Sequence, residues 1–179
     1  MHEREPLSEK LQGAPIDTLR EILRQAEAHL DAQLTAAIAA DQRAYTFAGL
    51  ASASAVLLLG GTYTALTATV PDLYIGLTAF FVAACLFVAS WMAVMSARSL
   101  DFEFAGSRPG VWTPDIEAGT PIERSLAEQC AHYDASINAN RQAMELNSWL
   151  FNWATNIALI SVGMGAVALL IWIRKTLGL

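Results

Sequence analysis

Few side chains in this sequence have the types and spacing that catalysis requires. Arg24 and His29 are separated by four residues, a spacing that some helical ribonucleases use. A pattern of two residue types arises frequently by chance, and the chain around it is acidic. A protein that binds RNA phosphates normally has clustered Lys and Arg, not an acidic surface. We therefore expect no catalysis at this pair and no binding of nucleic acid.

The histidines could also be considered as metal ligands. His29 and His132 would meet if the helices that carry them pair, and Asp31, Glu128 or Asp134 would complete a site. No His-x3-His or paired carboxylate motif supports such a site, so we interpret both histidines as surface residues. The sequence also has no Gly-rich phosphate loop, no Cys-x-x-Cys and no nucleophile elbow. We expect no catalytic residue, no metal and no cofactor.

Polar side chains inside an apolar stretch are a stronger signal. Asn152 and Asn156 are four residues apart and so share one helical face, which Ser148 extends. An amide in hydrocarbon is unfavourable unless it is paired, so this face should meet protein or water. The pattern predicts either the lining of a pore or an interhelical hydrogen bond.

A second polar pattern lies just before this stretch. Asn140 and Asn147 are seven residues apart, on the predicted seam of an amphipathic helix. A polar residue at a core heptad position commonly fixes register or oligomeric state. We therefore expect a homo-oligomer whose seam includes this pair. Small residues four apart, such as Ser161 and Gly165, would allow close helix approach within the chain or between copies.

The elements that must position these residues are long helices. Charged residues and histidine are absent from Ala44 to Pro71, from Leu73 to Ala97 and from Leu146 to Ile173. A bilayer core of roughly 30 Å needs about 20 apolar residues in a helix. Three such stretches would need a larger soluble core than a chain of 179 residues can build. We predict transmembrane helices at 44–68, 73–97 and 149–173.

The remaining residues are polar or amphipathic. Residues 1–14 are expected to be flexible, and apolar positions recur at three- and four-residue spacing over 15–43 and 121–148. Each of these segments continues into a predicted span without a proline. Several Gly and Pro residues in 98–120 predict an extended, non-helical connector. Three aromatic residues should hold this connector in place or bind a partner: Phe102, Phe104 and Trp112.

Charge gives an orientation in the membrane. Arg43, Arg98 and Arg108 flank the spans on the side of the amphipathic helices, against Arg174 and Lys175 on the other. The side richer in basic residues is normally cytoplasmic. The polar N-terminal segment also lacks the apolar region of a signal peptide. We expect a multi-pass protein of the cell membrane (inner or plasma membrane), with its N-terminus and polar helices in the cytoplasm.

The predicted fold is an all-α integral membrane protein. Its two long amphipathic helices form a cytoplasmic stalk or bundle, linked by the extended connector. In architecture alone this resembles small bacterial defence effectors that combine long soluble helices with two or more membrane helices. The sequence favours a non-enzymatic, self-associating protein of the lipid bilayer, either a pore-forming or membrane-perturbing effector or a scaffold. The alternative is a membrane anchor or accessory subunit that binds a larger protein complex on the cytoplasmic face.

Overall fold

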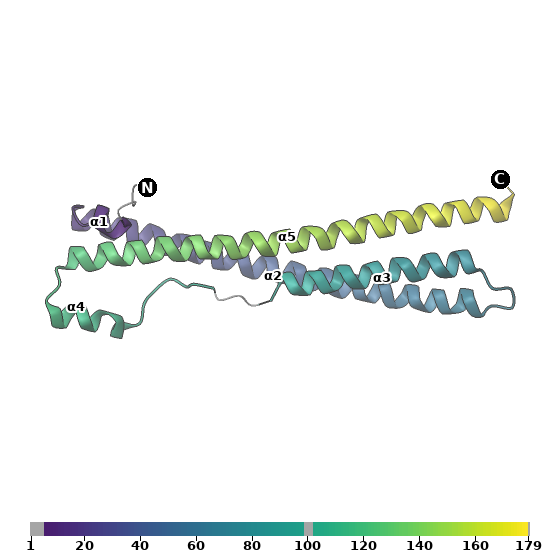
Figure 1. Cartoon of the computed structure of the whole chain (residues 1–179), viewed down its shortest axis with the longest axis horizontal. Coiled ribbons are helices and arrows are strands. Elements are labelled where there is room, and N and C mark those ends of the chain that lie inside the picture. The colour runs from purple at the N-terminus through teal and green to yellow at the C-terminus, as the bar shows by residue number, and fades with distance from the viewer. Residues whose placement is uncertain (1–5, 99–101, 179) are drawn as a thin grey trace. The chain divides into compact units, whose positions relative to one another are not determined.

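The computed structural model describes residues 6–98 and 102–178, which are mostly helical (Figure 1). In chain order the helices are α1 (Leu7–Leu11), α2 (Ile16–Thr67), α3 (Leu73–Ser96), the 3-10 helix η1 (Pro109–Trp112), α4 (Thr113–Ala118) and α5 (Ile122–Leu177). No strand occurs among these described residues. Helices α2, α3 and α5 are each long and apolar enough to cross a membrane. The prediction of an all-helical chain with three such helices is therefore confirmed.

The lengths of α2 and α5 follow from where proline stands in the sequence. No proline lies between Pro15 and Pro71, and none follows Pro121. Because proline is the residue that most strongly breaks a helix, nothing in these stretches interrupts the backbone hydrogen bonds. Helix α2 therefore joins the predicted amphipathic segment 15–43 to most of the predicted span 44–68. Helix α5 joins the segments 121–148 and 149–173 in the same way.

The prediction of an extended connector over 98–120 is wrong for its second half. Residues Pro109–Trp112 form η1 and Thr113–Ala118 form α4. Pro109 and Pro114 stand in the first turns of these helices, where a proline has no N–H to lose and its fixed φ suits the helix. Gly119, at φ 63°, ends α4 in the left-handed conformation. These Pro and Gly residues thus start and stop short helices rather than excluding them.

The chain forms two units. The polar unit comprises residues 1–38 and 99–144, and the apolar unit comprises 39–98 and 145–179. In the polar unit, Leu19 of α2 packs against Leu126 and Ala127 of α5. Trp112, from the end of η1, packs against this cluster from the connector. This small core holds the first halves of α2 and α5 together with the connector.

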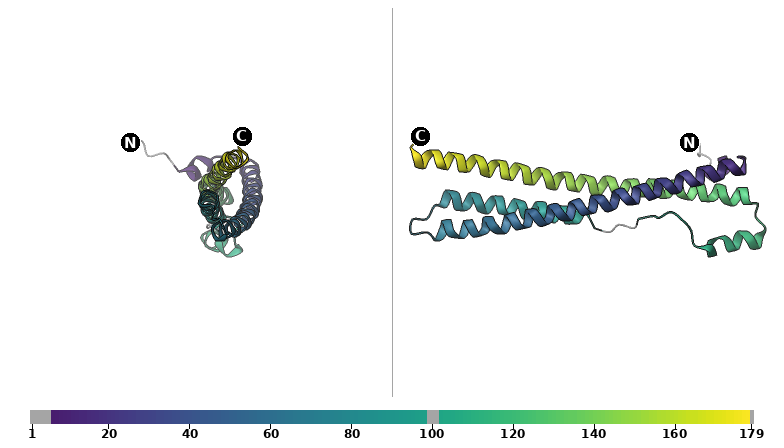
Figure 2. Two further views of the ribbon diagram at one scale, coloured as in Figure 1. Left: turned by 90° about the vertical axis from the view of Figure 1, so that its right-hand side faces the viewer. Right: turned by 180° about the vertical axis from the view of Figure 1, so that it is seen from behind.

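In the apolar unit, α3 runs back along the second half of α2 (Figures 1 and 2). The contacts are built from small residues, which let helix backbones approach closely. One cluster joins the three helices through Ala48, Ala93 and Ala154. A larger cluster is formed by Ala55, Val82, Ala83, Leu86, Ala89 and Ala158. The hydroxyl of Ser90 lies 2.7 Å from that of Ser52 and donates to the Ala48 carbonyl at 3.0 Å, so α2 and α3 also share hydrogen bonds.

Candidate functional site

Asn140 lies at the centre of a polar clamp in the polar unit. It is 1% exposed, and its Oδ1 accepts a hydrogen bond from the Glu103 N–H at 2.9 Å. Its Nδ2 donates to the Glu103 carbonyl at 2.9 Å and to Gln33 Oε1 at 3.3 Å. Gln33 in turn donates to the Ile137 carbonyl at 3.1 Å. The side chain of Asn140 thus pairs with the connector backbone much as a neighbouring strand would, and it also links α5 to α2.

A second contact holds the connector about two turns earlier on α5. The Gly106 N–H donates to the Tyr133 hydroxyl at 2.7 Å, and that hydroxyl donates to Glu27 Oε1 at 3.5 Å. Tyr133 is 2% exposed, so its ring is fully part of the core. Because Asn140 has partners within one chain, it gives no argument for an oligomer. The predicted seam then depends on Asn147, which is half-buried, and it stays a prediction.

The three aromatic residues of the connector have different environments. Trp112 packs into the core of the polar unit, and its Nε1 donates to Ser107 Oγ at 3.2 Å. Phe102 is half-buried, whereas Phe104 is 62% exposed. Their rings lie 6.3 Å apart. Asn140 and Tyr133, rather than these aromatics, supply the specific hydrogen bonds to the connector. Of the three, Phe104 remains the most accessible to a partner.

In the apolar unit, one face of α5 packs against the α2–α3 pair. Ala154 is 0% exposed and Ser161 is 1% exposed. A Cβ on Gly165 would lie 3.1 Å from Val82 Cγ2, so glycine allows this close approach. The Phe151 ring meets the Phe47 ring edge-on, with centroids 5.6 Å apart. The predicted small pair of Ser161 and Gly165 therefore serves packing within the chain.

The opposite face of α5 carries a continuous stripe at alternating three- and four-residue spacing. Every member is exposed, and we call this set the exposed stripe: Trp149, Asn152, Asn156, Leu159, Gly163, Ala166, Leu170 and Ile173. Ser148, one turn before Asn152, is exposed as well. Within residues 6–98 and 102–178, the side-chain amides of Asn152 and Asn156 have no hydrogen-bond partner. The predicted polar face therefore points away from the helices of its own chain.

Helix α5 has less cover than the other two apolar helices. Only 11% of its most apolar stretch is buried within the chain, against 33% for α3. A Cβ added at Gly163 would meet nothing within 4 Å. The structure thus leaves most of the second half of α5, including both asparagines, uncovered by the rest of the described chain.

A hydrogen bond ties the far end of α5 to the α2–α3 turn. Trp172 Nε1 donates to Asp72 Oδ2. The other carboxylate oxygen of Asp72 caps α3 by accepting from the Ile75 N–H at 3.1 Å. The hydrogen bonds from Ile75 and then Trp172 lower the pKa of the Asp72 carboxyl. Residue spacing could not predict this pair, because its members are one hundred positions apart.

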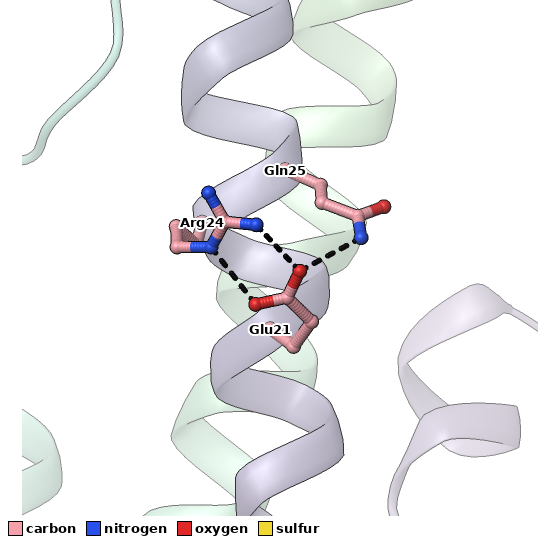
Figure 3. Close-up of polar contacts among 3 residues, drawn as sticks. All are labelled: Glu21, Arg24 and Gln25. Carbon is pink, nitrogen blue, oxygen red and sulfur yellow. Dashed lines mark hydrogen bonds and ion pairs between the residues drawn. The ribbon is translucent and has the colours of Figure 1, made fainter.

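Arg24, considered above for ribonuclease chemistry, is held by its neighbours on α2 (Figure 3). Its Nε and one terminal nitrogen donate to Glu21 at 2.8 and 2.6 Å, and Gln25 donates to the same carboxylate at 2.8 Å. The bonds from Arg24 and Gln25 lower the pKa of Glu21 to about 2. The guanidinium is therefore engaged by a carboxylate on its own helix.

Side chains that can act as metal ligands do not cluster in the part of the chain that the structure describes. No group of three or more His, Cys, Asp or Glu residues there could hold an ion.

The chain was also compared with protein-family models, with curated proteins and with solved structures, and none of these matched it. Among the described residues, the exposed stripe of α5, with its two unpaired asparagines, is the strongest indication of function.

Proposed function

We propose that this chain is an integral membrane protein with three spanning helices, and that it self-associates through the exposed stripe of α5. The observation that carries the proposal is the pair of amides on Asn152 and Asn156, which have no partner among the described residues. Transfer of an amide from water to a hydrocarbon that cannot hydrogen-bond costs about 4–8 kcal/mol. Such groups in a spanning helix therefore need a polar partner.

Asn156 is the more informative of the two. Trp153 and Trp172 would lie near the two membrane surfaces, because tryptophan favours the interface. They are separated by about 28 Å at 1.5 Å per residue, which matches a core of roughly 30 Å. Asn152 would then lie close to the interface, whereas Asn156 would lie about one turn deeper. Water can reach the first more easily than the second.

A second copy of the chain offers the simplest partner. Copies inserted in the same orientation place identical residues at the same depth, so Asn156 of one copy would meet Asn156 of another. An amide is both donor and acceptor and can therefore pair with itself. Gly163 and Ala166, on the same stripe, would let the two helix backbones approach closely. The stripe spacing of three and four residues also suits a parallel helix pair.

Self-association supports the two roles expected from the sequence, an effector that perturbs membranes or a scaffold. If several α5 helices surround a water-filled path, the same asparagines would line it. If two helices meet directly, the asparagines would pair in a dry contact. The absence of charged residues from Leu146 to Ile173 of α5 favours the dry contact, because ion pathways in membranes usually carry ionisable groups.

The proposal is tested with labelled copies of the full chain in lipid vesicles, using energy transfer to measure association. Asn156→Leu should weaken association about 3- to 30-fold, because interhelical hydrogen bonds in membranes contribute about 0.6–2 kcal/mol each. Thr155→Val is the matched control. Thr155 lies at the same depth, but its hydroxyl already bonds to the carbonyls of its own helix at 3.2 and 2.9 Å.

Each outcome of this experiment distinguishes between roles. Equal weakening by both variants, or by neither, would contradict pairing through Asn156 and favour an anchor that binds a different membrane protein. Dye leakage from the vesicles that is lost in Asn156→Leu would assign a water-filled path. Association without leakage would assign a scaffold.

The orientation is part of the same proposal. The balance of Arg43, Arg98 and Arg108 against Arg174 and Lys175 supports a polar unit in the cytoplasm. A maleimide that cannot cross membranes should then label Leu177→Cys but not Glu117→Cys in intact cells. Labelling of Glu117→Cys alone would reverse the orientation.

A further inference from the structure

The polar unit contains a cavity of about 500 Å³ between the connector and the first half of α5. Ser125, Gln129 and His132 line it from α5, at positions that share one helical face. Arg108 and Trp112 line it from the connector and η1. The cavity lies next to the contact between Gly106 and Tyr133, so the hydrogen bonds that hold the connector also shape this site.

Two polar groups on the α5 wall of this cavity lack partners. Nε2 of Gln129 is inaccessible to solvent and has no acceptor, and no other buried side-chain nitrogen or oxygen in the described residues is in this state. Ser125 is 5% exposed, and its hydroxyl makes no hydrogen bond within residues 6–98 and 102–178. An unpaired buried donor lowers stability, and nearly all such groups in folded proteins find a partner. The Ser125 hydroxyl is therefore free to donate to a ligand in the cavity.

The groups at the cavity mouth show which acceptor would fit. Arg108 is exposed and forms no ion pair within the described part of the chain, so its guanidinium is available to an anion. Two carboxylates also line the cavity, on Asp115 and Glu128. Glu128 is already bridged by Arg124 at 3.1 Å, but the pair of carboxylates still disfavours a multiply charged anion such as phosphate. Trp112 offers an apolar wall.

We propose that this cavity binds a small molecule that carries a single carboxylate, with an apolar group against Trp112. The carboxylate would accept hydrogen bonds from Arg108 at the mouth and from Ser125 on the α5 wall. This site lies within the polar unit and does not depend on self-association through α5. The free acid and the carboxyl end of a peptide share this chemistry, so both are probed.

The first test compares ligands on the full chain in detergent, with saturation-transfer NMR as the readout. Benzoate should bind, and benzamide, which has the same ring without the charge, should bind at least about tenfold more weakly, because hydrogen bonds to charged groups are the stronger ones. Tighter binding of N-acetylphenylalanine than of benzoate would assign the site to a peptide end, and the reverse would assign it to a free acid. Equal signals from benzoate and benzamide, or none at millimolar concentration, would overturn the proposal.

The second test uses variants of the cavity. Arg108→Gln should weaken benzoate binding at least about tenfold, because it removes the cation. Arg141→Gln, an exposed arginine of α5 that does not line the cavity, is its control and should leave binding unchanged. Equal affinity in Arg108→Gln and wild type would exclude a role for the guanidinium and contradict the proposed site.

Ser125→Ala gives an independent readout, because it removes the unpaired hydroxyl. Without ligand this variant should be as stable as wild type, since no hydrogen bond among the described residues is lost, and it should bind benzoate more weakly. Ser148→Ala replaces an exposed serine of the same helix and should change neither property. Normal benzoate binding by Ser125→Ala would contradict a role for this hydroxyl in the site.

Discussion

At the scale of single residues, Asn140 shows how a polar side chain can be essential to a core. Its position on the buried face of an amphipathic helix could be predicted from spacing, but its partners could not. They come from Glu103 and Gln33, which are 37 and 107 positions away in the chain. The sequence suggested a seam between copies because a buried asparagine needs partners. The structure supplies those partners within one chain.

This clamp predicts the effect of removing it. Asn140→Leu should destabilise the polar unit by about 1–3 kcal/mol, because the Glu103 backbone and Gln33 lose their partner. Asn138→Leu is the control, since Asn138 donates only to Asp134, on its own helix, and accepts from Arg141. Chemical unfolding in detergent followed by circular dichroism measures both. A smaller loss in Asn140→Leu than in Asn138→Leu would contradict the role given to the clamp.

Glu21 predicts a dependence on pH. Its carboxyl has a pKa of about 2 in the folded chain, against an ordinary value of 4.5, because Arg24 and Gln25 donate hydrogen bonds to it. A lowered pKa means that the ionised form is stabilised by folding. This contribution is fully present above pH 4.5 and is lost as the pH falls toward about 2. In Arg24→Gln, an NMR titration should give a Glu21 pKa closer to 4.5, and an unchanged value would contradict this account.

At the scale of elements, composition predicts the long helices well and the connector poorly. Charge-free stretches and the spacing of prolines define α2, α3 and α5, because nothing in them opposes a helix. By composition, Pro109, Pro114 and Gly119 indicate breaks in a helix, yet the same residue types also start and end helices. Their effect depends on whether a following residue has a capping partner, such as the Thr120 N–H that donates to the Asp115 carbonyl at 2.9 Å. That distinction is not visible in composition.

Helix α5 shows a second limit of sequence reasoning. Its apolar half carries small residues on two opposite faces, so spacing alone cannot show which face packs within the chain. The choice depends on shape: Val82 of α3 fills the space beside Gly165, whereas nothing lies beside Gly163. The predicted polar face of Asn152 and Asn156 thus follows from the sequence, but its exposure does not.

The two glycines of α5 give a matched pair of predictions. Gly165→Ile should destabilise the apolar unit by about 1–3 kcal/mol, because its side chain would press on Val82. Gly163→Ile should leave the fold of the single chain intact, since a Cβ there meets nothing within 4 Å. If the exposed stripe joins two copies, Gly163→Ile should instead weaken association. Thermal unfolding and energy transfer separate the two effects, and a folding defect in Gly163→Ile would contradict the packing described.

At the scale of the whole molecule, the chain divides its polar and apolar residues between two units that share the same two long helices. The polar unit holds the connector through Asn140 and Tyr133 and contains the cavity lined by Gln129. The apolar unit has three helices suited to a membrane, one of which is mostly uncovered. These assignments give the polar unit a role in ligand binding and the apolar unit a role in self-association, and the two proposals can fail separately.

The mass of the detergent-solubilised wild-type protein, measured by native mass spectrometry, tests self-association most directly. Self-association through the exposed stripe predicts a defined homo-oligomer of two or more copies that dissociates more readily in Asn156→Leu. Four or more copies would favour a ring around a water-filled path, and two would favour a direct contact between α5 helices. A monomer at every protein concentration would contradict the account, because both asparagines would then face lipid without a partner.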